Sequence, residues 1–196
     1  MTNYASLQNV FLIAMPQLSD SIFSQSVIYL WEYNEQGATG VIINKPTNVQ
    51  LGELLREVDV KKMSWHAENY AVLCGGPVVP EQIFIIRRHH RGIKDPEGNM
   101  LYEITISSTR QELAKLAIDE WKDEAIITLG CASWLPGQLD KELANNDWLV
   151  APFNDETLFG TALEDIGNRN SADAWYNAAA RSGIDLKRLS RDVGHA

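Results

Sequence analysis

The sequence predicts an α+β fold with a mixed β-sheet. Short apolar and β-branched runs, which are typical of strands, outnumber the segments with helical periodicity. Two of these runs, 26–33 and 38–44, flank the turn sequence NEQG, in which Gly37 can take the positive φ that a hairpin demands. We expect these two strands to pair antiparallel. A hairpin with no helix between its strands argues against a doubly wound parallel sheet.

Further strands are predicted from apolar runs bounded by turn residues. They cover residues 10–14, 71–74, 83–88, 101–108, 125–129 and 148–152. Helical spacing of apolar residues predicts four helices, over 51–58, 108–121, 138–146 and 171–183. Ser108 and Thr109 each precede a Gln or Glu at capping-box spacing, and Gly183 is placed to end the last helix. Residues 60–69 show no periodicity, so we expect an irregular segment there.

Length and charge limit the function classes. The 196 residues fit one domain, 1–196, with ordinary globular composition. A net charge of −9 repels nucleic acid, so direct DNA binding is not expected. The most basic stretch, RRHHRGIK at 87–94, precedes the turn sequence DPEGN and is interpreted as a solvated hairpin tip rather than a nucleic-acid contact.

The sequence indicates a cytoplasmic protein. Its two cysteines, Cys74 and Cys131, are too few and too far apart for a disulfide-rich secreted fold or a zinc framework. The apolar stretch 10–14 follows no basic segment, so it does not resemble a signal peptide. No run approaches the roughly 18 apolar residues of a membrane span. No His and carboxylate set has metal-ligand spacing, and we expect neither a metal nor a cofactor.

The stretch GCASWLPGQL, 130–139, is interpreted as a strand-to-helix turn that helps to line a shallow surface site. A nucleophile elbow has glycines two residues on either side of the nucleophile, and Cys131 lacks them, so we interpret this thiol as part of the core. Trp134, beside Pro136 and Gly137, is either a lid on the core or a stacking surface at a pocket.

The stretch CGGPV, 74–78, is the other candidate recognition turn. Consecutive glycines at a strand end can present several backbone N–H groups to an anion, although a plain tight turn also explains them. Asn44 and Lys45 stand just before Pro46 at a predicted strand exit, where binding groups often collect. Neither GATGVIINKP nor CGGPV fits a nucleotide-binding fingerprint.

Several linked stretches resemble the bacterial YqgE/AlgH family: 12–46, CGGPV, GCASWLPGQLDKELANNDWL and the closing GHA, in the same order over nearly the whole chain. The resemblance implies a largely antiparallel branched sheet curled into a pseudo-barrel with peripheral helices. Members are often labelled transcriptional regulators, and the family carries no agreed catalytic residues. The motif positions that transfer include Pro46 and the candidate ligand-binding residues, which are Asn44, Lys45, Gly75, Gly76, Pro77, Gly130, Trp134, Gly137 and Gln138.

Two functions follow from these observations. The first is a cytosolic binding or regulatory protein without catalysis, which acts through a protein partner or a small anionic ligand and affects transcription at most indirectly. The second is an enzyme for a small anionic substrate, with the Gly75 and Gly76 amides holding the anion and Cys131 or Gln138 near the reacting atom. The second function requires that the CGGPV and GCASWLPGQL turns converge in space.

Overall fold

A computed structural model describes residues 7–19, 21–94, 100–118, 125–160 and 171–186. It contains a nine-stranded sheet with the order β4-β5-β8-β3-β2-β1-β9, and β6 and β7 branch from this path at β8. The strands are β1 (Val10–Ala14), β2 (Val27–Asn34), β3 (Gly37–Ile42), β4 (Pro46–Gln50), β5 (Ala71–Cys74), β6 (Val78–Lys94), β7 (Met100–Ser107), β8 (Ala125–Trp134) and β9 (Trp148–Pro152).

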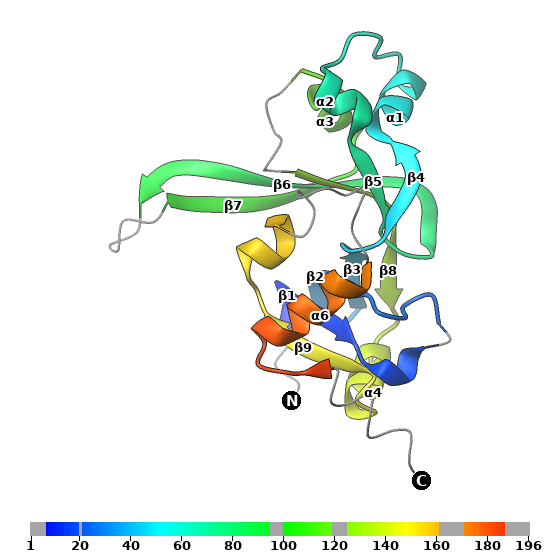
Figure 1. The fold of residues 1–196 in the computed structure, drawn as a ribbon, viewed down its shortest axis with the longest axis vertical. Helices are drawn as coiled ribbons and strands as arrows, with labels where there is room; N and C mark the ends of the chain where they lie inside the picture. The colour runs from blue at the N-terminus through cyan, green and yellow to red at the C-terminus, as the bar shows by residue number, and fades with distance from the viewer. Residues whose placement is uncertain (1–6, 20, 95–99, 119–124, 161–170, 187–196) are drawn as a thin grey trace.

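The predicted α+β class and mixed, mostly antiparallel branched sheet are confirmed. All strand pairs are antiparallel except β5 with β8. The strands at the two ends of the path, β4 and β9, pair with β5 and β1 respectively, so the sheet does not close into a barrel. Figure 1 shows β4 to β7 in the upper half of the molecule, β1, β2, β3 and β9 in the lower half, and β8 running from one half to the other.

Strand β8 joins the two halves because it changes partners along its length. Its first part pairs with β6 and β5, whereas Ala132–Trp134 pairs with β3. Gly130 lies at this change with a φ of +72°, a conformation that disfavours any side chain. A Cβ on Gly130 would also overlap the carbonyl oxygen of Gly76. A bend of this kind needs glycine for its φ and for the close backbone approach.

The helices cover different parts of the sheet. They are α1 (Leu51–Glu57), α2 (Trp65–Asn69), α3 (Arg110–Lys115), α4 (Gln138–Ala144) and α6 (Ser171–Arg181), with a single π-helical turn, η3, at Glu156–Gly160 and a short 3-10 helix, η2, at Pro16–Leu18. Figure 1 places α1, α2 and α3 together above the sheet, α6 across β1 and β2, and α4 at the opposite end.

The buried side chains form three clusters that match this arrangement. One packs α6 and η3 against β1, β2 and β8, and includes Phe11, Tyr29 and Trp175. A second packs α1, α2 and α3 on the upper strands, and a third packs α4 on β1, β2 and β3. The Trp175 indole N–H donates to the Ala14 carbonyl oxygen at 2.7 Å, which fixes α6 to the end of β1.

Several predicted elements need correction. The segment 60–69 contains α2, which begins at a Ser64 N-cap whose side chain accepts from the Ala67 N–H at 3.0 Å. The helix predicted over 108–121 is α3 and covers only Arg110–Lys115, with Thr109 as its N-cap; its predicted residue Trp121 lies outside the described residues. Pro46 begins strand β4 and does not end the structured segment, since a strand tolerates proline at its first position.

The basic stretch 87–94 lies within β6 rather than at a hairpin tip, and the expected tip, 95–99, lies outside the described residues. Strands β6 and β7 extend away from the rest of the sheet in Figure 1. Arg88 forms an ion pair with Asp155, and its guanidinium lies 4.9 Å from the Phe159 ring centroid and 5.8 Å from that of Tyr102. Part of this positive charge therefore serves to attach the hairpin to η3.

Substitution of Gly130 by alanine tests the role of the β8 bend. We expect Gly130→Ala to lower the free energy of unfolding by about 3 kcal/mol or more, because the new Cβ combines an unfavourable φ with overlap on a backbone oxygen. Gly137→Ala is the matched control, since Gly137 has a φ of +71° but nothing within 4 Å of its added Cβ, and should cost about 1 kcal/mol. Equal losses in urea unfolding would contradict the close-approach explanation.

Candidate functional site

The predicted site residues form two groups. Asn44, Lys45, Gly75, Gly76, Pro77 and Gly130 lie at the junction of the two sheet halves, where β3, β5 and β8 meet. Trp134, Gly137 and Gln138 lie at the turn between β8 and α4. The segment 15–26, which connects β1 to β2 and is described except at residue 20, contacts both groups through residues 22–25.

Asn44 anchors the segment 15–26 to the end of β3. Its side-chain oxygen accepts from the Val27 N–H at 2.8 Å, and its side-chain NH₂ donates to the Gln25 carbonyl oxygen at 2.8 Å. Asn44 is almost fully buried, so these hydrogen bonds satisfy groups that would otherwise be costly to bury. Both ends of its amide therefore serve the fold.

Lys45 holds the same segment from the neighbouring position. Its ammonium donates to the Ile22 carbonyl oxygen at 2.5 Å, while its own carbonyl oxygen accepts from the Cys74 N–H at 2.8 Å. Burial lowers the pKa of the Lys45 ammonium, an effect partly offset by the nearby Cys74 thiol. Lys45 thus links the segment 15–26 to β5.

The CGGPV turn and the Gly130 region do converge, as the enzyme hypothesis requires, but they meet through close backbone packing. Gly75 and Gly76 are buried, and Cβ atoms built on them would overlap the carbonyl oxygens of Gly130 and Cys131. The Gly75 N–H donates to the Leu129 carbonyl oxygen at 2.8 Å. The Gly75 N–H, which was expected to bind an anion, already has a partner inside the fold, and Gly75 itself allows the two backbones to pack closely.

The structure also corrects the interpretation of 130–139. Strand β8 continues through Trp134, so only 135–137 forms the turn into α4. Within this turn, Gly137 adopts a left-handed conformation at the N-cap of α4. The Gln138 side-chain oxygen accepts from the Leu135 N–H at 3.1 Å, and its NH₂ donates to Glu142 Oε1 at 2.9 Å. Gln138 thus closes the turn.

Trp134 lies in a buried aromatic cluster rather than on an open stacking surface. Its ring centroid lies 5.9 Å from that of Trp148 and 6.3 Å from that of Phe23. The indole N–H groups of Trp134 and Trp148 both donate to Glu142 Oε2 at 2.8 Å. One carboxylate on α4 therefore ties together the ends of β8 and β9, and Phe23 joins the segment 15–26 to the same cluster.

The segment 15–26 was not among the predicted site residues. Its signal in the sequence was weak, because Ser, Asp and Gln side chains in a turn predict only local structure. Its contacts with Asn44, Lys45 and the tryptophan cluster come from residues distant in the chain. Only the family resemblance, whose first stretch is 12–46, included this segment.

Cys131 lies in the core, as predicted. The residue is 4% exposed and packs with the cluster that contains Trp175 and Tyr29. Burial raises the pKa of the Cys131 thiol, so less of the reactive thiolate forms near neutral pH. Cys74 is more exposed than Cys131.

Exposed apolar residues lie on two segments that flank the first group. Ile22 is 49% exposed, Val79 is 47% exposed, and Pro77 and Val78 are also exposed. Val79 has a φ of +44°, which is a costly conformation for a β-branched residue. Lys45 connects the two segments that carry these residues, because its ammonium donates to the Ile22 carbonyl oxygen and its carbonyl oxygen accepts from the N–H of Cys74, three residues before Pro77. We call Ile22, Pro77, Val78 and Val79 the loop face.

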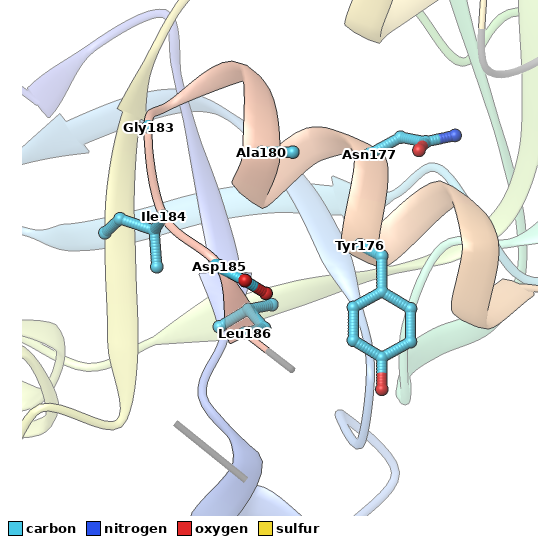
Figure 2. Close-up of a pocket in the computed structure, with 7 residues that line it drawn as sticks. All are labelled: Tyr176, Asn177, Ala180, Gly183, Ile184, Asp185 and Leu186. Carbon is cyan, nitrogen blue, oxygen red and sulfur yellow. The ribbon is translucent and has the colours of Figure 1, made fainter. Parts of the chain in front are cut away.

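A separate groove of about 540 Å³ lies beside the C-terminal end of α6. Figure 2 shows the Tyr176 ring projecting from α6, with the segment 183–186 forming the other wall. None of the predicted site residues lines this groove.

Among the residues that the structure describes, no group of three His, Cys, Asp or Glu side chains is arranged to hold a metal ion. No helix in the described part of the chain is long and apolar enough to cross a membrane.

Other proteins share this α+β fold with its branched, mostly antiparallel sheet. The family model DUF179, described as AlgH-like, matches residues 11–187. A UPF0301 protein of Coxiella burnetii is 40% identical over 190 residues, which cover 97% of both chains. One from Xanthomonas axonopodis is 40% identical over 192 residues, covering 97% of this chain and 96% of its own.

Solved structures agree with this assignment. The solution structure of the AlgH protein from Pseudomonas aeruginosa matches with a TM-score of 0.65 and 32% identity, and the match covers 100% of both chains. The crystal structure of DIP2367 from Corynebacterium diphtheriae matches with a TM-score of 0.66 at 23% identity, covering 93% of this chain and 91% of its own, and so shows the fold alone. The chain belongs to the AlgH-like family.

The tryptophan cluster can be tested through Glu142. We expect Glu142→Ala to lower the free energy of unfolding by about 2–4 kcal/mol, because two indole N–H groups lose their acceptor. Glu142→Gln keeps an acceptor oxygen and should cost about half as much. Urea unfolding followed by tryptophan fluorescence measures both. Glu57→Ala, on an exposed part of α1, should stay within about 0.5 kcal/mol.

The two cysteines should differ in reactivity. With a thiol reagent such as DTNB at pH 8, we expect Cys74 to react first and Cys131 to react only as the protein unfolds, because burial protects the Cys131 thiol and raises its pKa. In Cys74→Ser only the slow reaction should remain. Fast labelling of Cys131 in that variant would contradict a core role and support the enzyme hypothesis.

Proposed function

We propose that this chain is a non-catalytic binding protein of the cytoplasm that docks a protein partner on the loop face, and that any effect on transcription passes through that partner. The strained backbone of Val79 carries the proposal. A β-branched residue at positive φ costs about 1–3 kcal/mol, and such strain concentrates at functional sites. Here it holds an exposed apolar side chain outward.

The groups beneath the loop face support this function. The hydrogen-bonding groups of Asn44, the Lys45 ammonium and the Gly75 N–H are all engaged in internal hydrogen bonds. These bonds fix the backbone on both sides of the loop face, which lowers the entropy lost when a partner binds. The family motifs then serve as a rigid support for an apolar contact surface.

The alternative function, an enzyme for a small anionic substrate at the CGGPV and GCASWLPGQL turns, has one supporting observation, which is that the turns meet. It has less support in the chemistry at that point. The Gly75 amide is already bonded to Leu129, and burial raises the pKa of the Cys131 thiol. A net charge of −9 likewise disfavours direct DNA binding.

The experiment captures partners of the tagged protein from lysate of its own host, and then titrates the purified partner by calorimetry. We expect Ile22→Glu and Val79→Glu to weaken binding at least tenfold, since each places a charge in an apolar contact. Ile118→Glu is the matched control. Ile118 is also an exposed isoleucine, at 79%, but it lies beyond α3 and outside the loop face, so binding should not change.

Val79→Gly separates strain from binding. Glycine accepts a φ of +44°, so this variant should be about 1 kcal/mol more stable than the parent protein in urea unfolding. It also removes an apolar contact, so partner affinity should fall. A partner that binds Ile22→Glu, Val79→Glu and Val79→Gly as tightly as the parent protein would show that the loop face is not the docking surface.

A further inference from the structure

A small crevice lies between α6 and the β1–β9 edge, away from both groups of predicted site residues. Its volume is about 90 Å³, enough for about half a dozen water-sized atoms. Phe11, Ile13, Ala151 and Ala178, each 5% exposed or less, form its apolar base, and the more exposed Pro152 and Phe153 add to the apolar lining. The polar residues Asn154, Thr157, Arg181 and Ser182 complete the lining. An apolar wall with convergent polar groups is typical of a small-molecule site.

Arg181 is the cation of this crevice. Its guanidinium donates to the Thr157 hydroxyl at 3.2 Å and forms an ion pair with Glu156 at 2.9 Å. The Thr157 hydroxyl in turn donates to the Asn154 side-chain oxygen at 3.2 Å, so its own proton is engaged and its oxygen is oriented toward Arg181. These bonds hold the guanidinium over the crevice.

The Glu156 carboxylate occupies a place beside Arg181 that another carboxylate can take. Its side chain is 73% exposed, whereas that of Arg181 is 39% exposed. An exposed ion pair contributes only about 0–1 kcal/mol, so an external carboxylate can displace Glu156 at small cost. Arginine binds carboxylates through two parallel N–H donors, a geometry that an external anion can adopt more freely than a tethered side chain.

We propose that this crevice binds a short aliphatic monocarboxylate, with its carboxylate on Arg181 and its alkyl chain against Pro152, Phe153 and the apolar base of the crevice. The charge selects the anion, and the volume limits the chain to a few carbons. Helix α6 is fixed to the end of β1 by Trp175, and the segment 15–26 follows β1 directly. The ligand site therefore lies on elements that are continuous with the loop face.

The experiment titrates the ¹⁵N-labelled full chain with acetate, propionate, butyrate and hexanoate, at an ionic strength held constant with sodium chloride. The backbone amides of Thr157 and Ser182 report binding. We expect saturable shifts with a Kd of about a few millimolar, as fits so few ligand atoms. Affinity should rise by up to about fourfold per methylene as far as butyrate and fall for hexanoate. Butyramide, which lacks the charge, should not bind.

Four variants test the assignment. Arg181→Gln should abolish binding, whereas Glu156→Gln should strengthen it about two- to fivefold, because the competing carboxylate is gone. Ala151→Val narrows the crevice and should remove the dependence on chain length. Arg56→Gln, which breaks another exposed Arg–Glu pair between α1 and α2, is the matched control and should leave binding unchanged.

A purely structural role for the Arg181–Glu156 pair predicts different results. Glu156→Gln would then change stability but not carboxylate affinity. Equal binding by Arg181→Gln and the parent protein, or shifts that sodium chloride alone reproduces, would overturn the proposal. Glu156→Gln keeps Arg181 and its Thr157 hydrogen bond, so the proposal stays testable even if Arg181→Gln unfolds.

Discussion

The close contact of two backbones, at Gly75 and Gly76 on one side and Gly130 and Cys131 on the other, is the constraint on which the fold depends. No side chain fits between these segments. Because they touch, β8 can pair with β5 and β6 and then with β3, and one strand serves both halves of the sheet. The glycines are therefore needed for the architecture before they can serve any recognition.

Most of the fold was predictable from the sequence because periodicity and turn chemistry act locally. The β2–β3 hairpin, α1 and α6 each have a period, a cap or a glycine turn that specifies them. Helix α2 could not be found this way, since its five residues are too short to show a period. In the sequence, Gly130 resembles the end of a strand. In the structure β8 continues past Gly130, which packs directly against the Gly76 backbone.

The candidate site was predictable in its residues but not in their roles. Glycines, an Asn-Lys pair and a tryptophan near a turn indicate a special location, and these residues do lie at the junction of the two sheet halves and at the turn between β8 and α4. Whether an amide or an indole faces solvent or a neighbouring strand depends on contacts between distant segments. The bond from the Gly75 N–H to Leu129 and the contact of Trp134 with Phe23 join segments that no local pattern relates.

The motif side chains therefore act mainly inward, and the exposed groups around them decide what the protein can recognise. Asn44 and Lys45 fix the segment 15–26 at Gln25 and Ile22, and Phe23, which lies between these two residues, packs on the tryptophan cluster. The backbone is thus held at and directly after Ile22, whose side chain stays 49% exposed. Selection for stability alone would favour glycine over valine at a φ of +44°, so keeping an exposed Val79 there costs folding energy. That cost makes sense if the side chain contacts something outside the chain.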